Sequence, residues 1–201
     1  MTATLTAPPP PATTPPARLT ADDFDRMGSD GKGYELIDGE LVEQAVSYLS
    51  SYVSGEVHRL LANHVKPRGL GWVAPEGTAF RCLPDSPNTV RKADTAFHRL
   101  DRLTAEQATR RGFCPVVPDL VVEVVSPDDR AYEVDDKRAE WLTAGARLVW
   151  VIYPDTRTVH AYAADGTVRL FGPADELTAA PVLPDFRTPV ADLFTLPAAV
   201  S

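Results

Sequence analysis

The chain has few of the residues that mark a cysteine- or histidine-based site. Of its 201 residues only two are cysteines, Cys82 and Cys114, and they do not form a C-x-x-C pair. This scarcity argues against a disulfide framework and a cysteine-based zinc site, and it favours a reducing cytoplasm. The four histidines are scattered without metal-ligand spacing, and no G-x-S-x-G elbow, Walker phosphate loop or H-E-x-x-H motif occurs.

Long apolar runs are also lacking. No run approaches the roughly 18 residues that cross a bilayer, and the N-terminus has neither the basic start nor the apolar core of a secretion signal. We therefore expect no membrane partner. Residues 1–17 are a Pro/Ala/Thr tract without periodicity, which predicts a disordered tail. Residues 18–201 are enough for one α/β domain with a core of its own.

Basic residues are outnumbered. The chain has 20 Lys and Arg against 28 Asp and Glu, a formal net charge of −8 at pH 7. Proteins that bind nucleic acid passively usually show the opposite balance. The balance still permits an enzyme whose carboxylates hold divalent cations, because the metal reverses the local charge.

The most concentrated apolar segment is residues 117–127, V-P-D-L-V-V-E-V-V-S-P. Its valines and flanking prolines predict a buried strand. Alternation places Asp119 and Glu123 on one face and the apolar residues Leu120, Val122 and Val124 on the other. A carboxylate in such a strand is costly to bury unless a cation, a metal or hydrogen-bond donors meet it. Asp119 and Glu123 are about 13 Å apart along the strand, so they cannot both ligate one ion directly. Asp119 is therefore either a secondary site residue or a structural one.

The pattern around this strand predicts alternating strands and helices. In chain order we expect a helix over 21–27, a hairpin over 34–43 turning at Asp38-Gly39, a helix over 50–65, a strand over 71–83 that is either continuous or bent or paired around residues 75–77, and a strand over 89–98. After these we expect a polar helix or loop over 103–111, a helix ending near Ala144, and strands over 147–153, 158–163 and 168–171. The strand, helix and apolar strand spanning 117–153 form a βαβ-like unit. Apolar residues after 182 predict that the C-terminal segment packs back onto the core.

Two charged residues near this unit have alternative interpretations. Lys137 lies beside the apolar stripe of the helix that follows Glu123, so its side chain can fold back over the strand or extend along the helix into water. Asp94, in the strand over 89–98, can pair with Arg91 or Lys92 at the surface or point at the same site as Glu123.

Five segments occur in order along the chain: Y-E-L-I-D-G-E-L-V-E, V-R-K-A-D-T-A-F, V-P-D-L-V-V-E-V-V-S-P, D-D-K-R-A-E-W-L-T-A-G-A-R-L-V-W-V-I-Y-P and, near the C-terminus, L-P-D-F-R-T-P-V-A-D-L-F. Together they resemble the Uma-type restriction endonuclease family. The resemblance covers roughly residues 20–196. It implies the α/β fold of the PD-(D/E)xK nuclease superfamily: a mixed central sheet flanked by helices, here with an N-terminal hairpin.

The resemblance also implies a site. Asp94 matches the first acid and Glu123 the second, and together they would bind Mg²⁺ or Mn²⁺. The superfamily lysine two residues after the second acid is Val125 here. Family members supply the lysine from the following helix, which implies Lys137. Many relatives have a histidine near the start of the first long helix, where this chain has Ser51.

The function that follows from the resemblance is metal-dependent hydrolysis of DNA by an endonuclease. Glu43 is a candidate additional ligand, and the candidate phosphate contacts are Arg91, Lys92, Arg110 and Arg111, each of which is otherwise an ordinary surface charge. We expect a homodimer, because double-strand cleavage needs two sites. The alternatives are a non-catalytic nuclease-like module that binds a partner or nucleic acid, favoured by the −8 charge and the missing histidine, and a hydrolase that pairs Cys114 with a histidine.

Overall fold

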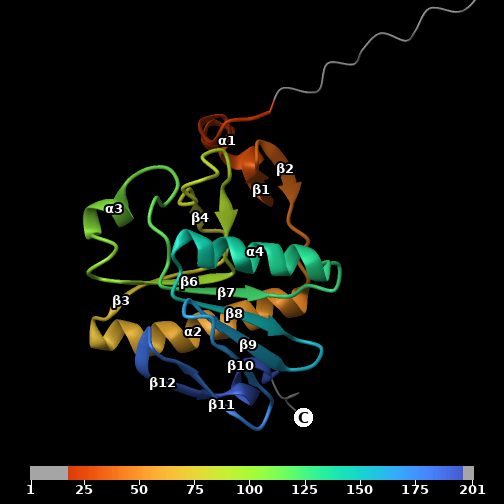
Figure 1. The fold of residues 1–201 in the computed structure, drawn as a ribbon, viewed down its shortest axis with the longest axis vertical. Helices are drawn as coiled ribbons and strands as arrows, with labels where there is room; N and C mark the ends of the chain where they lie inside the picture. Colours follow the sequence, from red (N-terminus) through yellow and green to blue (C-terminus); the bar gives the residue numbers. More distant parts are fainter. Residues whose placement is uncertain (1–17, 197–201) are drawn as a thin grey trace, which may run out of the picture.

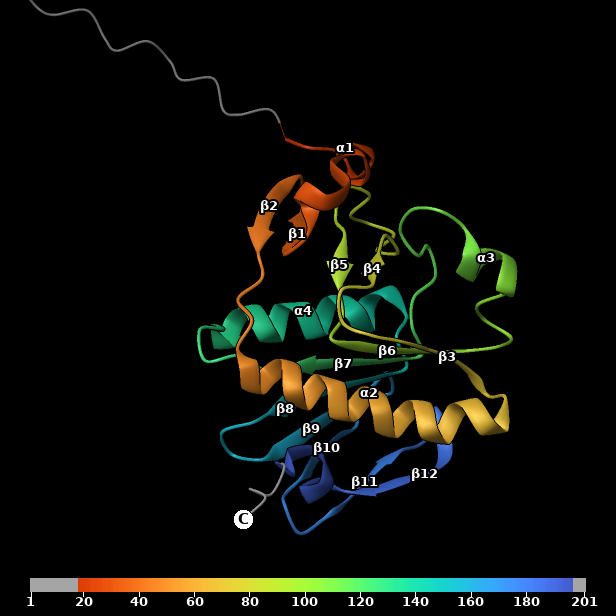
Figure 2. The ribbon, with the colours of Figure 1, turned by 180° about the vertical axis from the view of Figure 1, so that it is seen from behind.

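A six-stranded mixed sheet with the strand order β10-β9-β8-β7-β6-β3 forms the centre of the molecule. Its strands are β3 (Gly71–Ala74), β6 (Thr95–Arg99), β7 (Leu120–Val124), β8 (Leu148–Tyr153), β9 (Thr158–Ala163) and β10 (Val168–Phe171). Strands β7 and β8 are parallel, and the other neighbours are antiparallel. Helix α2 (Tyr48–Arg68) covers one face and α4 (Ala131–Ala144) the other (Figures 1 and 2). The predicted mixed sheet flanked by helices is therefore confirmed.

The structure is a computed structural model that describes residues 18–196. The predicted disordered tail, residues 1–17, lies outside the described residues. The remaining elements are α1 (Ala21–Met27), η1 (Gly28–Gly31), β1 (Tyr34–Ile37), β2 (Glu40–Glu43), β4 (Ala79–Phe80), β5 (Arg91–Lys92), α3 (Ala105–Thr109), β11 (Glu176–Ala179), β12 (Leu183–Pro189) and η2 (Val190–Phe194). Within this part of the chain no helix has the length and apolar character needed to cross a membrane.

The βαβ unit forms as its sequence predicts. Alternation along β7 sends Leu120 and Val122 into the core beneath α2 and Val121 into the core beneath α4. Helix α4 ends at Gly145, whose φ of 110° is the left-handed conformation that suits glycine, and its N–H donates to the Leu142 carbonyl. The chain can then turn directly into β8, which lies parallel to β7.

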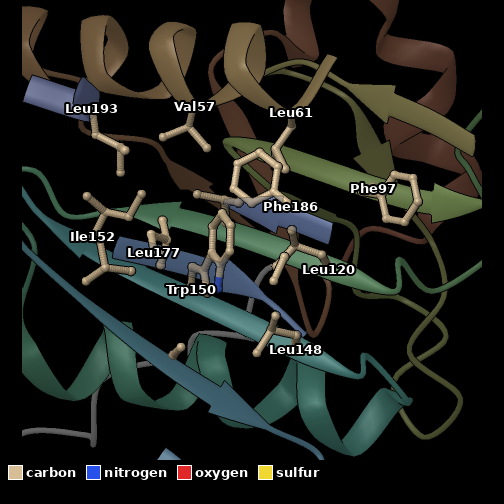
Figure 3. Close-up of a cluster of buried hydrophobic side chains, with 14 of the residues drawn as sticks. Val57, Leu61, Phe97, Leu120, Leu148, Trp150, Ile152, Leu177, Phe186 and Leu193 are labelled. Atoms are coloured by element: carbon tan, nitrogen blue, oxygen red, sulfur yellow. The ribbon is translucent and has the colours of Figure 1, made fainter. Parts of the chain in front are cut away.

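The core beneath α2 is closed by the C-terminal segment, as predicted. Figure 3 shows Val57 and Leu61 of α2 pointing toward Trp150, with Phe186 beside them. The Trp150 and Phe186 rings lie 5.8 Å apart between centroids, and Trp150 is fully buried. The hairpin of β11 and β12 in this segment was not predicted from the sequence, where the segment stands out only by its apolar residues.

Three predicted boundaries are corrected. The predicted strand 89–98 breaks at Asp94: β5 pairs with β4, whereas β6 pairs with β7 in the main sheet. The predicted strand 71–83 divides into β3 and β4 at residues 75–77, where a bend or pairing was expected and Gly77 has a φ of 84°, and its second half ends at Phe80 instead of residue 83. Helix α2 is longer than 50–65, because Ser47 caps its start and Pro67 is accommodated in its last turn before Gly69.

The small strands build a wall that stands away from the main sheet. The hairpin of β1 and β2 turns at Asp38 and Gly39, as predicted, with φ angles of 47° and 83°. Leu36 of β1 bridges to Val90, which joins the hairpin to β5 and β4. Figure 2 shows these strands side by side above α4. This wall faces the C-terminal half of β7.

The start of β3 generates a stability prediction. A Cβ added to Gly71 would collide with the His98 carbonyl oxygen and lie 2.7 Å from the Phe97 ring, so Gly71→Ala forces β3 away from β6. We expect a loss of about 3 kcal/mol in the free energy of unfolding, measured in urea. Gly55→Ala is the control, because a Cβ meets nothing within 4 Å there in α2, and it should stabilise the protein by about 0.5–1 kcal/mol. Equal effects of the two substitutions would contradict this account.

Candidate active site

A cavity of about 590 Å³ opens between the hairpin of β1 and β2, the start of α2 and the first turns of α4. We call it the acidic cleft, because ten carboxylate side chains and three basic ones line it: Glu35, Glu43, Glu76, Asp94, Glu123, Asp128, Asp129, Glu133, Asp136 and Glu140, with Arg91, Arg130 and Lys137. The excess of acid at this one place accounts for much of the negative charge of the whole chain.

Glu123 lies at the floor of the cleft, on the face of β7 that points to α4. Lys137 Nζ lies 2.9 Å from its Oε2, and Trp141 Nε1 donates to its Oε1 at 2.8 Å. Both oxygens therefore accept donors, as in an ionised carboxylate. Burial nevertheless raises the pKa of Glu123 to about 8, against the effect of Lys137, and the nearby Asp94 and Glu35 add to the increase.

Lys137 is engaged by the protein and does not extend into water. Its Nζ lies 3.2 Å from Glu35 Oε1 and donates to the Lys92 carbonyl at 2.8 Å, and its side chain is 17% exposed. Burial alone would lower its pKa, but the carboxylates of Glu123, Glu35 and Asp94 outweigh burial and raise the pKa above the ordinary range. The ammonium is thus a fixed positive charge.

Glu35 is the central residue that the sequence analysis missed. Its Oε1 accepts a hydrogen bond from the Lys92 backbone N–H at 2.6 Å, and its Oε2 accepts one from Arg91 Nη1 at 3.0 Å. Burial raises its pKa, but Lys137 and Arg91 reverse the shift, so the net pKa is lowered. A glutamate next to buried Leu36 in a short strand is a weak signal. Its role depends on the contact between β1 and β5, which no local pattern reveals.

Asp94 occupies the break between β5 and β6. Its Oδ2 accepts from the Val124 N–H at 2.5 Å, and its carbonyl accepts from Ser54 Oγ at 2.9 Å. Burial raises its pKa to about 6, although Lys137 and the Val124 N–H oppose the increase. The structure therefore brings Asp94 and Glu123, predicted as a pair, into one cleft with Lys137.

The other candidate residues have different positions. Asp119 is fully buried at the far end of β7, where it accepts from the Arg99 N–H at 3.0 Å and pairs with Arg102 at 3.3 Å, so its contacts are structural. Ser51 and Glu43 line the acidic cleft without a contact to Glu123.

The expectation that Arg91 and Lys92 are surface cations is wrong. Arg91 is 7% exposed and binds Glu140 through two hydrogen bonds, of 2.7 and 2.8 Å, besides its contact with Glu35. Lys92 is 8% exposed and donates to the Gly31 carbonyl at 3.3 Å. Arg91 therefore points toward α4 and the acidic cleft, whereas Lys92 points toward η1. Arg110 and Arg111 are exposed after α3, away from the cleft.

The cysteine-based alternative receives no support from the thiols. Burial raises the pKa of Cys114, and it raises that of Cys82 to about 12. A nucleophilic cysteine needs the opposite shift, because the thiolate is the reactive form. Both cysteines are free and pack beside the core beneath α4.

The donor set fits a hard divalent cation. Mg²⁺ is commonly held by one or two carboxylates, with water and substrate phosphate completing its shell. Among residues 18–196 no group of three or more His, Cys, Asp or Glu side chains is arranged to hold a metal. Asp94 and Glu123 correspond to the two-carboxylate kind of site, in which burial of two acids is offset by a cation.

Glu123 should make the stability of the protein depend on pH. Its pKa is raised from 4.5 to about 8, so the folded protein holds this proton more tightly than the unfolded chain. The contribution of Glu123 to the free energy of unfolding is therefore fully present below the pKa of this residue in the unfolded chain, and it decreases as the pH rises to about 8. Between about pH 5.5 and 8 we expect the melting temperature of the wild type to fall by ~5 °C relative to Glu123→Gln, which cannot titrate.

Scanning fluorimetry across this range measures the difference. Glu35 does not interfere, because its lowered pKa confines its contribution to more acidic solutions. Glu176→Gln, at an exposed position of β11, should follow the wild type at every pH. Parallel curves for the wild type and Glu123→Gln would contradict the assignment of a raised pKa.

Comparison with known proteins agrees with the fold and the motifs. The model of the Uma2 family, described as "Putative restriction endonuclease", matches residues 21–191. A crystal structure from Anabaena variabilis ATCC 29413, described as "a putative nuclease belonging to DUF820", superimposes with a TM-score of 0.72 at 21% identity. The alignment covers 88% of this chain and 97% of that one, which shows a shared fold. No curated protein matches the chain. Because the family model spans most of the sequence, the chain belongs to the Uma2 family.

Proposed function

We propose that the protein is a divalent-metal-dependent endonuclease that hydrolyses phosphodiester bonds in DNA. The observation that carries the proposal is the contact of Lys137 with Glu123 in the cleft that also contains Asp94. Two buried carboxylates and a fixed ammonium are the groups that phosphoryl chemistry needs near a negatively charged substrate. Membership of the Uma2 family and the description of the Anabaena protein support the same reaction class.

In this proposal Asp94 and Glu123 hold Mg²⁺ or Mn²⁺. The bound metal supplies a water of lowered pKa and positive charge beside the phosphate. Lys137 contributes as a hydrogen-bond donor and a positive charge, which stabilises charge on the phosphate oxygens. Its raised pKa argues against the role of general base, because an ammonium whose pKa lies above the ordinary range of lysine does not release its proton near pH 7. Glu35 and the Lys92 carbonyl orient the ammonium.

A cleavage assay tests the proposal. Supercoiled and single-stranded DNA are incubated with the protein and Mg²⁺ or Mn²⁺, beside Glu123→Gln and Lys137→Ala. We expect nicking that depends on the metal and falls by at least ~100-fold in both variants. The matched controls are Glu176→Gln and Lys66→Ala, which change exposed residues far from the cleft and should cleave as the wild type does. Equal cleavage by all five proteins, or none with either metal, would refute the proposal.

Glu35 should be a positioning residue. Glu35→Gln keeps the shape of the side chain but removes one of the charges that hold Lys137. We expect kcat for DNA cleavage to fall by ~10-fold or more while KM stays within about twofold, because the ammonium is mispositioned for the chemical step. Glu40→Gln on the same hairpin is the control, since Glu40 is exposed. An unchanged kcat in Glu35→Gln would remove Glu35 from the mechanism.

The second candidate function is a non-catalytic module that binds nucleic acid or a protein. The acidic lining of the cleft and Ser51 in place of a histidine favour it. DNA binding without cleavage under every metal condition would support this candidate. We also propose that the protein is a homodimer located in the cytoplasm. Sedimentation velocity measures its oligomeric state directly.

A further inference from the structure

A second cavity, of about 390 Å³, lies between β3, β4 and the segment 100–116 that contains α3. We call it the insertion pocket. Figures 1 and 2 both show α3 on the side of β4 away from the hairpin of β1 and β2. The cavity is in the size range of small-molecule sites, about 300–1,000 Å³. Nothing in the proposed chemistry at Glu123 uses it.

The walls of the insertion pocket are aromatic. Trp72 and His98 are directly paired across β3 and β6, so they share the face of the sheet that the segment 100–116 covers. Phe80 stacks on His98 with centroids 5.8 Å apart and an interplanar angle of 28°, and Phe113 also lines the cavity. The Trp72 indole N–H already donates to the Leu103 carbonyl at 3.0 Å. The part of Trp72 that remains for a ligand is the face of its ring, and the residue as a whole is 37% exposed.

His98 adds an acceptor without a partner. Its ring is 1% exposed, and its Nε2 lies 3.1 Å from the Val116 carbonyl, so the proton belongs on Nε2. Nδ1 is then an acceptor, and it is buried without a hydrogen-bond partner in the described part of the chain. A buried polar atom of this kind needs an explanation. A ligand that donates a hydrogen bond supplies one.

The rim of the pocket carries groups for a charged, polar ligand. Arg110 lines the cavity and is exposed, and Gln107 lies one turn before it at the end of α3. Arg110 is one of the suggested phosphate contacts that do not line the acidic cleft. A ligand with a flat ring, hydrogen-bond donors and an attached phosphate would match the walls, His98 and Arg110 together.

We propose that the insertion pocket binds the base of an unpaired nucleotide in the DNA substrate. Stacked and paired bases cannot present a free face, so the nucleotide must be single-stranded or turned out of the duplex. The inference rests on the proposed nucleic-acid substrate and specifies how that substrate is held.

The insertion pocket and the acidic cleft share a wall. Phe80 meets Trp141 edge to face at 5.7 Å, and Trp141 donates to Glu123. The turn between β3 and β4 contributes Glu76 to the cleft and Thr78 to the pocket. The same few elements can therefore bind one base of a DNA strand in the insertion pocket and place a neighbouring phosphate of that DNA strand in the acidic cleft.

Tryptophan fluorescence tests the pocket without any cleavage. Trp141 and Trp150 are fully buried, so Trp72 is the indole that a ligand can reach. Titration of the full-length protein with dAMP, dGMP, dCMP and dTMP should give saturable quenching with at least one of them. Deoxyribose 5-phosphate and inorganic phosphate, which lack a base, should give none. Trp72→Phe should abolish the signal, which shows that Trp72 reports it.

Ala108→Phe fills the cavity from an exposed position of α3 and leaves the cleft untouched. We expect it to abolish quenching of Trp72 and to raise KM for single-stranded DNA by about tenfold with kcat unchanged, the order of one lost base stack. No saturable quenching by any nucleotide, quenching by deoxyribose 5-phosphate, or undiminished quenching in Ala108→Phe would overturn the proposal. Nucleotide quenching in a protein that cleaves no DNA would uphold the pocket and refute the nuclease, so the two failures are distinct.

Discussion

The buried ion pair between Lys137 and Glu123 is the interaction on which the rest of the site depends. Removing two charges from water is costly, and their mutual attraction offsets the cost only if further hydrogen bonds complete both partners. Here the Trp141 indole N–H donates to Glu123, while Glu35 and the Lys92 carbonyl accept from the Lys137 ammonium. These five residues come from four elements, with Lys137 and Trp141 both on α4, so the network ties β7, α4, β1 and β5 together. Loss of any one element would leave a charge buried without compensation.

The need to compensate the Lys137 charge gives the small strands β1, β2, β4 and β5 a structural role. The main sheet and α4 alone would leave one side of Lys137 exposed. The hairpin of β1 and β2 brings Glu35 to that side, and Arg91 binds Glu35 and Glu140 at once, which joins the hairpin to α4. The result is a cleft with far more acid than base, in which a divalent cation is favoured and a bare phosphate backbone is not. Under the proposed function, recognition of nucleic acid then relies on metal and on contacts outside the cleft.

Much of the fold follows from local patterns in the sequence. The βαβ unit, the hairpin at Asp38-Gly39 and the inward direction of Glu123 are set by alternation, turn chemistry and helix caps, which act over a few residues. The ordered motifs, through the family that they resemble, also indicate Asp94, Glu123 and Lys137 as candidate site residues. Glu35 and the burial of Arg91 could not be predicted, because both result from pairing between segments more than 50 residues apart. The break at Asp94 was hidden for the same reason: a continuous alternating pattern does not reveal that its two halves pair with different sheets.

That break has a consequence for how the chain tolerates changes in length. Successive residues of a strand point to opposite faces, so one residue inserted between Lys92 and Thr95 would invert every side chain on one side of the insertion. Either Arg91 or Asp94 would then turn away from its partners. In the segment 100–116 the strand pairing is the bridge of Cys114 to Phe80, and Leu103 accepts from Trp72, so it is the residues between these two points that carry no such constraint. The length of the chain is thus free to vary in the loop beside the insertion pocket. Next to Asp94 and Glu123 it cannot change by even one residue.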